Sequence, residues 1–255
     1  MRLLVLCLLC CLPLHSLLAQ PLCTSPLRVG FDDWPPYHYY QQENGHRELR
    51  GFAVDYLNAV SARLGCRLVY LERPWKRGLH DLEQGRLDIA MEAYFVEDRA
   101  RYAWFSHAYN PGRTALWVRK SGDKGEQDLA SWLAKGNRLG VTRDYNYGPE
   151  IARLLQRYRA QVSEVNDVQN YRKLQLGRID GFLGDILATP WGLKREGLAE
   201  EVVPHIMGVY ETPTFFMLSK KTLSGEFVQR FNQALEAVGK SEEHALIWRR
   251  YLPAR

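Results

Sequence analysis

Short apolar segments alternate with amphipathic segments along most of the chain, and this alternation constrains the fold more than any other feature of the sequence. Residues 27–31 are typical of a strand and are followed by a turn-prone stretch that contains Pro35 and Pro36. Apolar residues then recur at helical spacing until Gly65, and residues 67–71 return to a strand pattern. This order predicts a parallel α/β sheet with right-handed crossovers.

The alternation continues beyond the first sheet. A short helix that ends at Gly85 precedes a strand at 87–91, and a further helix follows Gly148 and Pro149. Two more helices are expected near the carboxyl end of the sequence. The remaining strands are expected at residues 114–118, 138–142, 179–183, 201–204 and 215–218. Two α/β units without a low-complexity linker predict two lobes that pack around a cleft.

The first residues have the pattern of a secretory signal. Arg2 precedes an apolar run from Leu3 to Leu14, and Ala19 offers a small residue for cleavage. A membrane-spanning helix needs about 20 apolar residues, and this run is shorter. We therefore expect residues 1–19 to be a signal peptide, and the mature protein to be exported without stable membrane insertion. An uncleaved anchor is the alternative.

Charge and motif content disfavour several classes of function. The net charge of +5 arises from 34 basic and 29 acidic residues that are mixed along the chain, so no nucleic-acid partner is expected. The sequence lacks a nucleophile elbow, a phosphate-binding glycine loop and metal-ligand histidine spacing. His38 lies in a polar context that favours the solvated surface. We expect a monomer that is not an enzyme and needs no cofactor or metal.

Two cysteines, Cys23 and Cys66, lie outside the predicted signal peptide. Export would place them in an oxidising compartment, where a single pair has one intramolecular connectivity. Cys23 precedes the first expected strand and Cys66 precedes the second. If these strands are parallel neighbours, both sulfur atoms lie at the same end of the sheet and form a disulfide. Two free buried cysteines are the alternative.

Five segments, taken in order, form a recognisable series. They are residues 27–37, 51–56, 82–90, 97–109 and 176–185, which contain LRVGFDDWPPY, GFAVDY, LEQGRLDIA, EDRARYAWFSHAY and LGRIDGFLGD. Together they resemble the bacterial extracellular solute-binding proteins of family 3, which include periplasmic amino-acid-binding proteins of ABC transporters. The similarity covers nearly the whole mature chain and implies that the mature protein is periplasmic.

The resemblance implies the two-lobed type II periplasmic-binding-protein fold, with two parallel-rich sheets, flanking helices and a two-strand hinge. It implies a first lobe made of residues 24–110 and 209–255, with residues 111–208 forming the second lobe. Such proteins close around a small ligand and present the closed form to an ABC permease or to a membrane sensor. Closure between lobes can desolvate a small polar ligand on all sides.

The same resemblance implies roles for four residues. Arg99 matches the arginine that grips a ligand carboxylate, a task that suits a planar guanidinium. Asp185 matches the acid that receives the ligand ammonium, and Trp34 and Trp75 match aromatics that sandwich the ligand. The alternatives are a surface helix residue for Arg99, a helix N-cap for Asp185 and core positions for the two tryptophans.

Other positions depart from the amino-acid-binding pattern. Val96 replaces the usual threonine, and Asp144-Tyr145 replaces a glycine with a hydroxyl residue. Glu92 stands where a small residue is usual, and Asp144 could pair with Arg99. We therefore expect Glu92, Asp144 and Tyr145 to contact the ligand.

Asp32 is a further candidate, with a turn aspartate as its alternative. A cleft rich in acids and aromatics favours a cationic or amine-bearing ligand, with an α-amino acid as the alternative. A sensory protein and a cyclohexadienyl-dehydratase-like enzyme, with Glu92 or Asp144 as its acid, are the competing functions.

Overall fold

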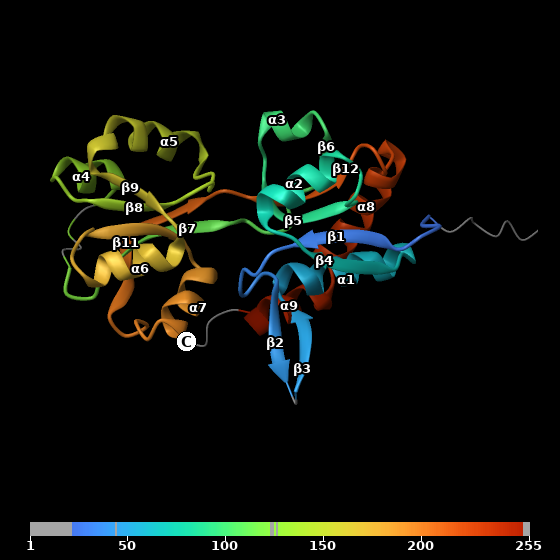
Figure 1. The fold of residues 1–255 in the computed structure, drawn as a ribbon, viewed down its shortest axis with the longest axis horizontal. Coiled ribbons are helices and arrows are strands. Elements are labelled where there is room, and N and C mark those ends of the chain that lie inside the picture. Colours follow the sequence, from blue (N-terminus) through green and yellow to red (C-terminus); the bar gives the residue numbers. More distant parts are fainter. Residues whose placement is uncertain (1–21, 44, 123–124, 126, 252–255) are drawn as a thin grey trace, which may run out of the picture.

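The computed structural model describes residues 22–43, 45–122, 125 and 127–251 of the chain. The predicted signal peptide, residues 1–19, therefore lies outside the described residues. Figure 1 shows two five-stranded sheets, each flanked by helices, with extended segments running between them. We call each sheet with its helices a lobe. Within the described ranges, no helix is both long and apolar enough to cross a membrane.

The first sheet has the strand order β4-β1-β5-β12-β6. β1 (Leu27–Phe31) pairs in parallel with β4 (Leu68–Glu72) and β5 (Ile89–Tyr94), as the strand–helix–strand pattern predicted. β12 (Thr214–Ser219) lies between β5 and β6 (Ala103–Phe105) and runs antiparallel to both. The sheet therefore combines the first part of the chain with a strand that returns from beyond the second sheet.

The second sheet has the order β11-β7-β10-β8-β9. β7 (Arg113–Arg119) runs antiparallel to β11 (Val202–Glu211) and to β10 (Gly181–Asp185). β8 (Leu139–Thr142) runs parallel to β10 and to β9 (Val162–Val165). Each sheet thus has three parallel strands followed by two that join antiparallel, which is the arrangement of the predicted two-lobed α/β fold.

Helices cover both faces of the first sheet. Ile89 and Met91 of β5 pack in one core with residues of α1, α8 and α9, whereas Ala90 and Ala93 pack on the opposite face with Leu82 of α2. This alternation places α2 across the sheet from α1 (Figure 1). The helices of this lobe are α1 (Phe52–Leu64), α2 (Trp75–Glu83), α3 (Glu97–Ala100), α8 (Gly225–Gly239) and α9 (Glu242–Tyr251). Those of the second lobe are α4 (Leu129–Ala134), α5 (Gly148–Arg157), the 3₁₀ helix η1 (Arg159–Gln161), α6 (Asp167–Gln175) and α7 (Ala188–Arg195).

The chain crosses between the lobes twice, from β6 to β7 and from β11 to β12, and the two crossovers touch. Asn110 forms an isolated antiparallel bridge with Thr214, and the Thr212 N–H donates to the Gly112 carbonyl at 2.7 Å. Gly112 has φ +54°, and a Cβ atom there would lie 1.9 Å from the Thr212 oxygen, so only glycine fits. The division into residues 24–110, 111–208 and 209–255 stays a prediction.

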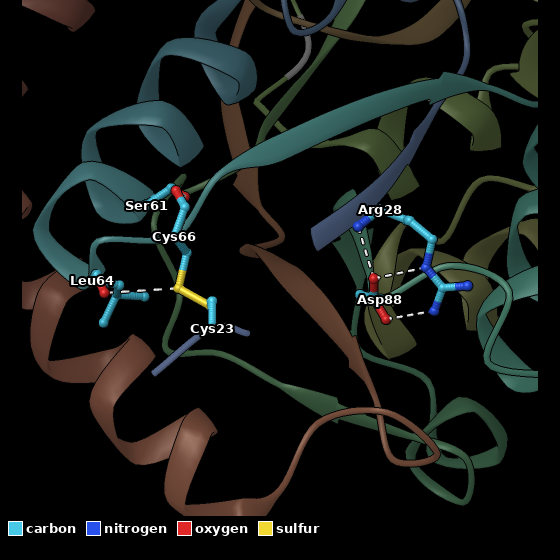
Figure 2. The surroundings of a disulfide bond; sticks show 6 residues. All are labelled: Cys23, Arg28, Ser61, Leu64, Cys66 and Asp88. Atoms are coloured by element: carbon cyan, nitrogen blue, oxygen red, sulfur yellow. Dashed lines mark hydrogen bonds and ion pairs between the residues drawn. A yellow bond between two sulfur atoms is a disulfide. The ribbon is translucent and has the colours of Figure 1, made fainter. Parts of the chain in front are cut away.

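The predicted disulfide between Cys23 and Cys66 is present, with the two Cα atoms 5.4 Å apart. Leu27 of β1 faces Leu68 of β4, which brings the residues before both strands to one end of the sheet. Figure 2 shows the bond beside Ser61, whose hydroxyl donates to the Cys66 carbonyl at 2.6 Å. The expectation drawn from parallel neighbouring strands is confirmed.

Several elements were not expected from the sequence. The hairpin β2 (Tyr39–Glu43) and β3 (His46–Arg50) projects away from both sheets (Figure 1). Its strands are largely polar and exposed, so they lack the alternation that marks a half-buried strand. β9, α4 and α6 were also not predicted, and β10 begins at Gly181 instead of residue 179. Each of these elements is too short or too polar to show a clear hydrophobic periodicity in the sequence.

Candidate functional site

A cavity of about 520 Å³ opens between the two lobes, and we call it the larger cavity. All predicted ligand-binding residues except Asp185 line it. From the first lobe these are Asp32, Trp34, Trp75, Glu92 and Arg99. From the second lobe they are Asp144 and Tyr145. The cavity therefore brings together side chains that are far apart in the sequence and that come from loops, strand ends and helix starts.

A second cavity of about 200 Å³, here the smaller cavity, adjoins the larger one. Four residues line both, namely Asp33, Trp34, Tyr145 and Asp167. Asp185 lines the smaller cavity, whereas Arg99 lines the larger one. An α-amino acid carries its carboxylate and ammonium on one carbon. The two residues expected to hold those groups thus line different cavities.

Asp185 is already engaged by protein donors. Its carboxylate accepts hydrogen bonds from the Tyr37 hydroxyl at 2.9 Å and from the backbone N–H groups of Leu187 and Ala188 at 2.8 and 2.7 Å. The backbone bonds close the turn that leads into α7, but the N-cap residue of this helix is Leu187, so Asp185 itself is not the N-cap. Burial raises the pKa of Asp185 to about 6. Tyr37 follows β1 in the first lobe, so this buried bond links the two lobes.

Glu92 joins the larger cavity to both crossovers. Its carboxylate accepts from Tyr109 at 2.5 Å and Asn110 at 2.9 Å on the first crossover, and from Thr214 at 2.7 Å on the second. The residue is 5% exposed and has φ +51°, an uncommon conformation for a non-glycine residue. Burial is the main cause that raises the pKa of Glu92 to about 7. Glu92 thus lines the larger cavity and, at the same time, is hydrogen-bonded to both crossovers.

Arg99 lies against the ring of Trp75 and forms no ion pair with Asp144, the partner that we considered for it. Its guanidinium carbon is 5.5 Å from the ring centre of Trp75. Burial lowers the pKa of Arg99 from its ordinary value, and Tyr102 and Asp144 oppose this shift. Asp144 forms its ion pair with Lys76 instead, with 3.2 Å between Nζ and Oδ2. Asp144 therefore acts on Arg99 only as a nearby charge here, and the possible pairing of these two residues is replaced by the pair with Lys76.

Aromatic rings from both lobes form the wall between the cavities. The ring centroids of Trp34 and Tyr145 are 5.8 Å apart at 87°, and Tyr145 lies 5.8 Å from Tyr94 in a similar edge arrangement. Trp34 also packs on Tyr37 with 4.5 Å between centroids. Such faces can hold a cation or an apolar stem. The predicted position of Trp34 in a cleft agrees with this placement.

Sequence reasoning missed Asp167, Tyr94 and His38. Asp167 follows β9 just as Asp185 ends β10, but β9 itself was not predicted, so the signal was lost. His38 is 3% exposed and lines the larger cavity, whereas we expected it on the surface. Its Nδ1 lies 2.6 Å from the Asp32 carbonyl oxygen, and burial lowers its pKa. In the described residues no cluster of His, Cys, Asp and Glu could hold a metal ion.

The fold and the site define a class of protein. Two α/β lobes, two crossovers and a cavity lined from both sides are the features of a protein that captures a solute between its lobes. The sequence model of the bacterial extracellular solute-binding proteins, family 3, matches residues 27–254. The chain belongs to this family, and the resemblance noted in the sequence is confirmed.

Named relatives bind different solutes. The arginine-binding periplasmic protein of Mannheimia haemolytica is 23% identical over 86% of this chain and 87% of its own length. The L-cystine-binding protein TcyA of Bacillus subtilis is 27% identical over 82% of this chain and 75% of its own. These relatives are solute-binding proteins and not enzymes.

Solved structures show the same fold. An ancestral arginine-binding protein bound to arginine has a TM-score of 0.70 and 23% identity, covering 89% of this chain and 98% of that one. A histidine kinase sensor domain with similarity to periplasmic binding proteins has a TM-score of 0.72 and 20% identity, covering 90% and 96%.

Proposed function

We propose that this protein captures a small amine-bearing solute, an amino acid or a related cation, in the larger cavity and delivers it to an ABC transporter. The observation that carries the proposal is the make-up of the cavity wall. Carboxylates of Asp32, Glu92 and Asp167 and rings of Trp34 and Trp75 line one cavity between the lobes. Carboxylates and aromatic faces are the groups that attract an ammonium or guanidinium in a desolvated site.

The proposal assigns Arg99 to an acidic group of the ligand. The guanidinium borders the larger cavity, and its ion-pairing groups are free of Asp144 because that acid pairs with Lys76. An arginine in such a place matches the planar geometry of a carboxylate. In this proposal the protein acts in the periplasm as a monomer, and residues 1–19 serve as its export signal. Names of relatives that bind arginine or cystine support an amine-bearing ligand.

Ligand binding is expected to raise the melting temperature. At a ligand concentration of about 100 Kd, the free energy of unfolding rises by about 2.7 kcal/mol, which corresponds to roughly 5–10 °C. We expect this shift with members of a panel of L-arginine, L-histidine and 1,4-diaminobutane, measured by differential scanning fluorimetry. Glucose and succinate serve as neutral and dianionic comparisons. Stabilisation by those two alone would contradict the proposal.

Removal of the Arg99 guanidinium is expected to weaken the binding of carboxylate-bearing ligands. Arg99→Ala should lower the affinity for L-arginine at least tenfold, or about 1.4 kcal/mol, measured by isothermal titration calorimetry. The effect on 1,4-diaminobutane should be smaller, because that ligand has no carboxylate. Arg101→Ala is the matched control, since Arg101 is exposed and pairs with Asp98 outside the cavity. Equal losses in both variants would contradict the assigned role.

An enzymatic function has one supporting observation, which is the raised pKa of Glu92 inside a cavity. A general acid needs a proton that it can transfer to substrate. The Glu92 carboxyl is hydrogen-bonded to Tyr109, Asn110 and Thr214 and is 5% exposed, so it is engaged by the crossovers and offers little access to a substrate. Incubation with prephenate or arogenate tests the dehydratase alternative, and formation of an aromatic product would replace our proposal.

A further inference from the structure

Among the described residues, Asp167 is one of two acidic residues that line both cavities, and it is half-buried whereas the other, Asp33, is exposed. Asp167 is the first residue of α6 and follows β9 in the second lobe. Its side chain lines the larger cavity together with Arg99, and it lines the smaller cavity together with Asp185. A ligand that extends from one cavity into the other would therefore pass this carboxylate.

Asp167 also has more unused capacity to accept hydrogen bonds than Asp185 and Glu92, two of the acids that the sequence singled out. Asp185 receives three hydrogen bonds from the protein, and so does Glu92. In the described part of the chain, Thr142 is the one side chain that donates to Asp167. An ionised carboxylate offers about four acceptor sites, so Asp167 can receive further donors from a ligand.

The other charged groups near the smaller cavity do not take this role. Asp33 borders both cavities, but this residue is exposed to solvent. Arg195 borders the smaller cavity and adds one positive charge there. Burial raises the pKa of Asp167, and a nearby cation would favour its ionised form. Binding of a positive group beside Asp167 would thus compensate for the desolvation of its ionised carboxylate.

Aromatic rings surround the same place. Trp34 and Tyr145 stand between the cavities, and Tyr171 of α6 lines the smaller one. Ring faces attract cations, and the attraction is larger in a desolvated site. A cavity lined by this carboxylate and by three aromatic residues is suited to a primary ammonium or a guanidinium.

We infer that Asp167 is the counter-ion for the cationic end of the ligand, and that this end enters the smaller cavity, away from Arg99. The inference rests on the proposed function and makes it more specific. The preferred ligand then carries its positive charge at a distance from its carboxylate, as in an ω-amino acid. An α-amino acid with an uncharged side chain fits less well, because its two charges lie on one carbon.

Two isomers with the same atoms test this inference by isothermal titration calorimetry. 5-Aminopentanoate carries its ammonium at the end of the chain, whereas L-2-aminopentanoate carries it next to the carboxylate. We expect the wild-type protein to bind 5-aminopentanoate at least tenfold more tightly. Asp167→Asn should weaken binding of 5-aminopentanoate at least tenfold. Glu164→Gln is the matched control, because Glu164 is an exposed acid on β9, three residues from Asp167.

Each outcome has a defined meaning. Equal or tighter binding of L-2-aminopentanoate, or binding of neither isomer, would overturn the inference. An Asp167→Asn variant within twofold of wild type would overturn it as well. In either case, stabilisation of the protein by L-arginine, L-histidine or 1,4-diaminobutane would leave the proposed function standing. Circular dichroism melting of each variant establishes that it is folded, and the isomer comparison on the wild type requires no substitution.

Discussion

The melting temperature of the ligand-free protein is expected to fall as the pH rises from about 5 to about 7.5, and Glu92→Gln should remove much of this fall. Burial raises the pKa of Glu92 from 4.5 to about 7. Between these values the folded state keeps a proton that the unfolded state has released. The stabilisation is therefore complete below the unfolded pKa and is lost as the pH rises through the folded pKa.

The expected size of this effect is large for one side chain. A shift of this extent corresponds to about 3 kcal/mol across the full window, or roughly 6–12 °C in melting temperature. Asp185 acts in the same direction, because burial raises its pKa from 3.8 to about 6. Ion pairs change the melting temperature with pH in the opposite direction. Arg28 and Arg138 hold the pKa values of Asp88 and Asp180 low, so the stabilisation from these pairs is lost as the pH falls.

Differential scanning calorimetry at four pH values between 5 and 7.5 measures this effect. The comparison is between wild type, Glu92→Gln and Glu97→Gln, in which an exposed acid of α3 is changed as the control. The melting temperatures of wild type and Glu97→Gln should fall with pH at the same slope, and the melting temperature of Glu92→Gln should depend less on pH. Parallel lines for all three proteins would show that Glu92 does not titrate in this range. The hinge contacts of Glu92 would then be independent of pH.

Loss of the Cys23–Cys66 disulfide is expected to lower the free energy of unfolding by about 4 kcal/mol. The bond joins residues 43 positions apart, and the chain-entropy relation gives this value for a loop of that size. The loop contains β1, the β2–β3 hairpin and α1, so an unfolded chain without the bond explores many more conformations. A drop of roughly 8–16 °C in melting temperature follows from this value.

The experiment compares the oxidised wild type, the wild type with dithiothreitol, and the double variant Cys23→Ser with Cys66→Ser. The reduced wild type and the double variant should melt at the same lower temperature. The reductant should leave the double variant unchanged, which controls for effects on other parts of the protein. A loss under 1 kcal/mol would mean that contacts such as the Ser61–Cys66 hydrogen bond hold this end of the sheet without the covalent link.

The parts of the fold that could be predicted are those with strong local patterns. β1 and β4 are short apolar strands, and α1 has a clear helical period that ends at Gly65 in a left-handed cap. The spacing of Cys23 and Cys66 from these strands then fixed their pairing. The polar β2–β3 hairpin gave no such pattern, because its strands bury little on either side.

The candidate site was predicted less completely, for a physical reason. Resemblance to a family pointed to Trp34, Trp75 and Arg99, and these residues do border one cavity. Which acid faces which part of the cavity depends on how the lobes close. The Lys76–Asp144 ion pair and the position of Asp167 between two cavities are contacts between distant segments, and no local spacing encodes them.

The hydrogen bond from Tyr37 to Asp185 has a consequence for the timing of solute exchange. It joins the lobes through groups of the protein itself, so it favours closure whether or not the cavity is filled. An empty molecule would then spend a fraction of its time closed, and a filled one would have to break the bond before its solute escapes. The bond would slow dissociation and, at the same time, would let any partner that recognises the closed form meet empty copies. Residence time and background signal are thus set by the same pair of side chains.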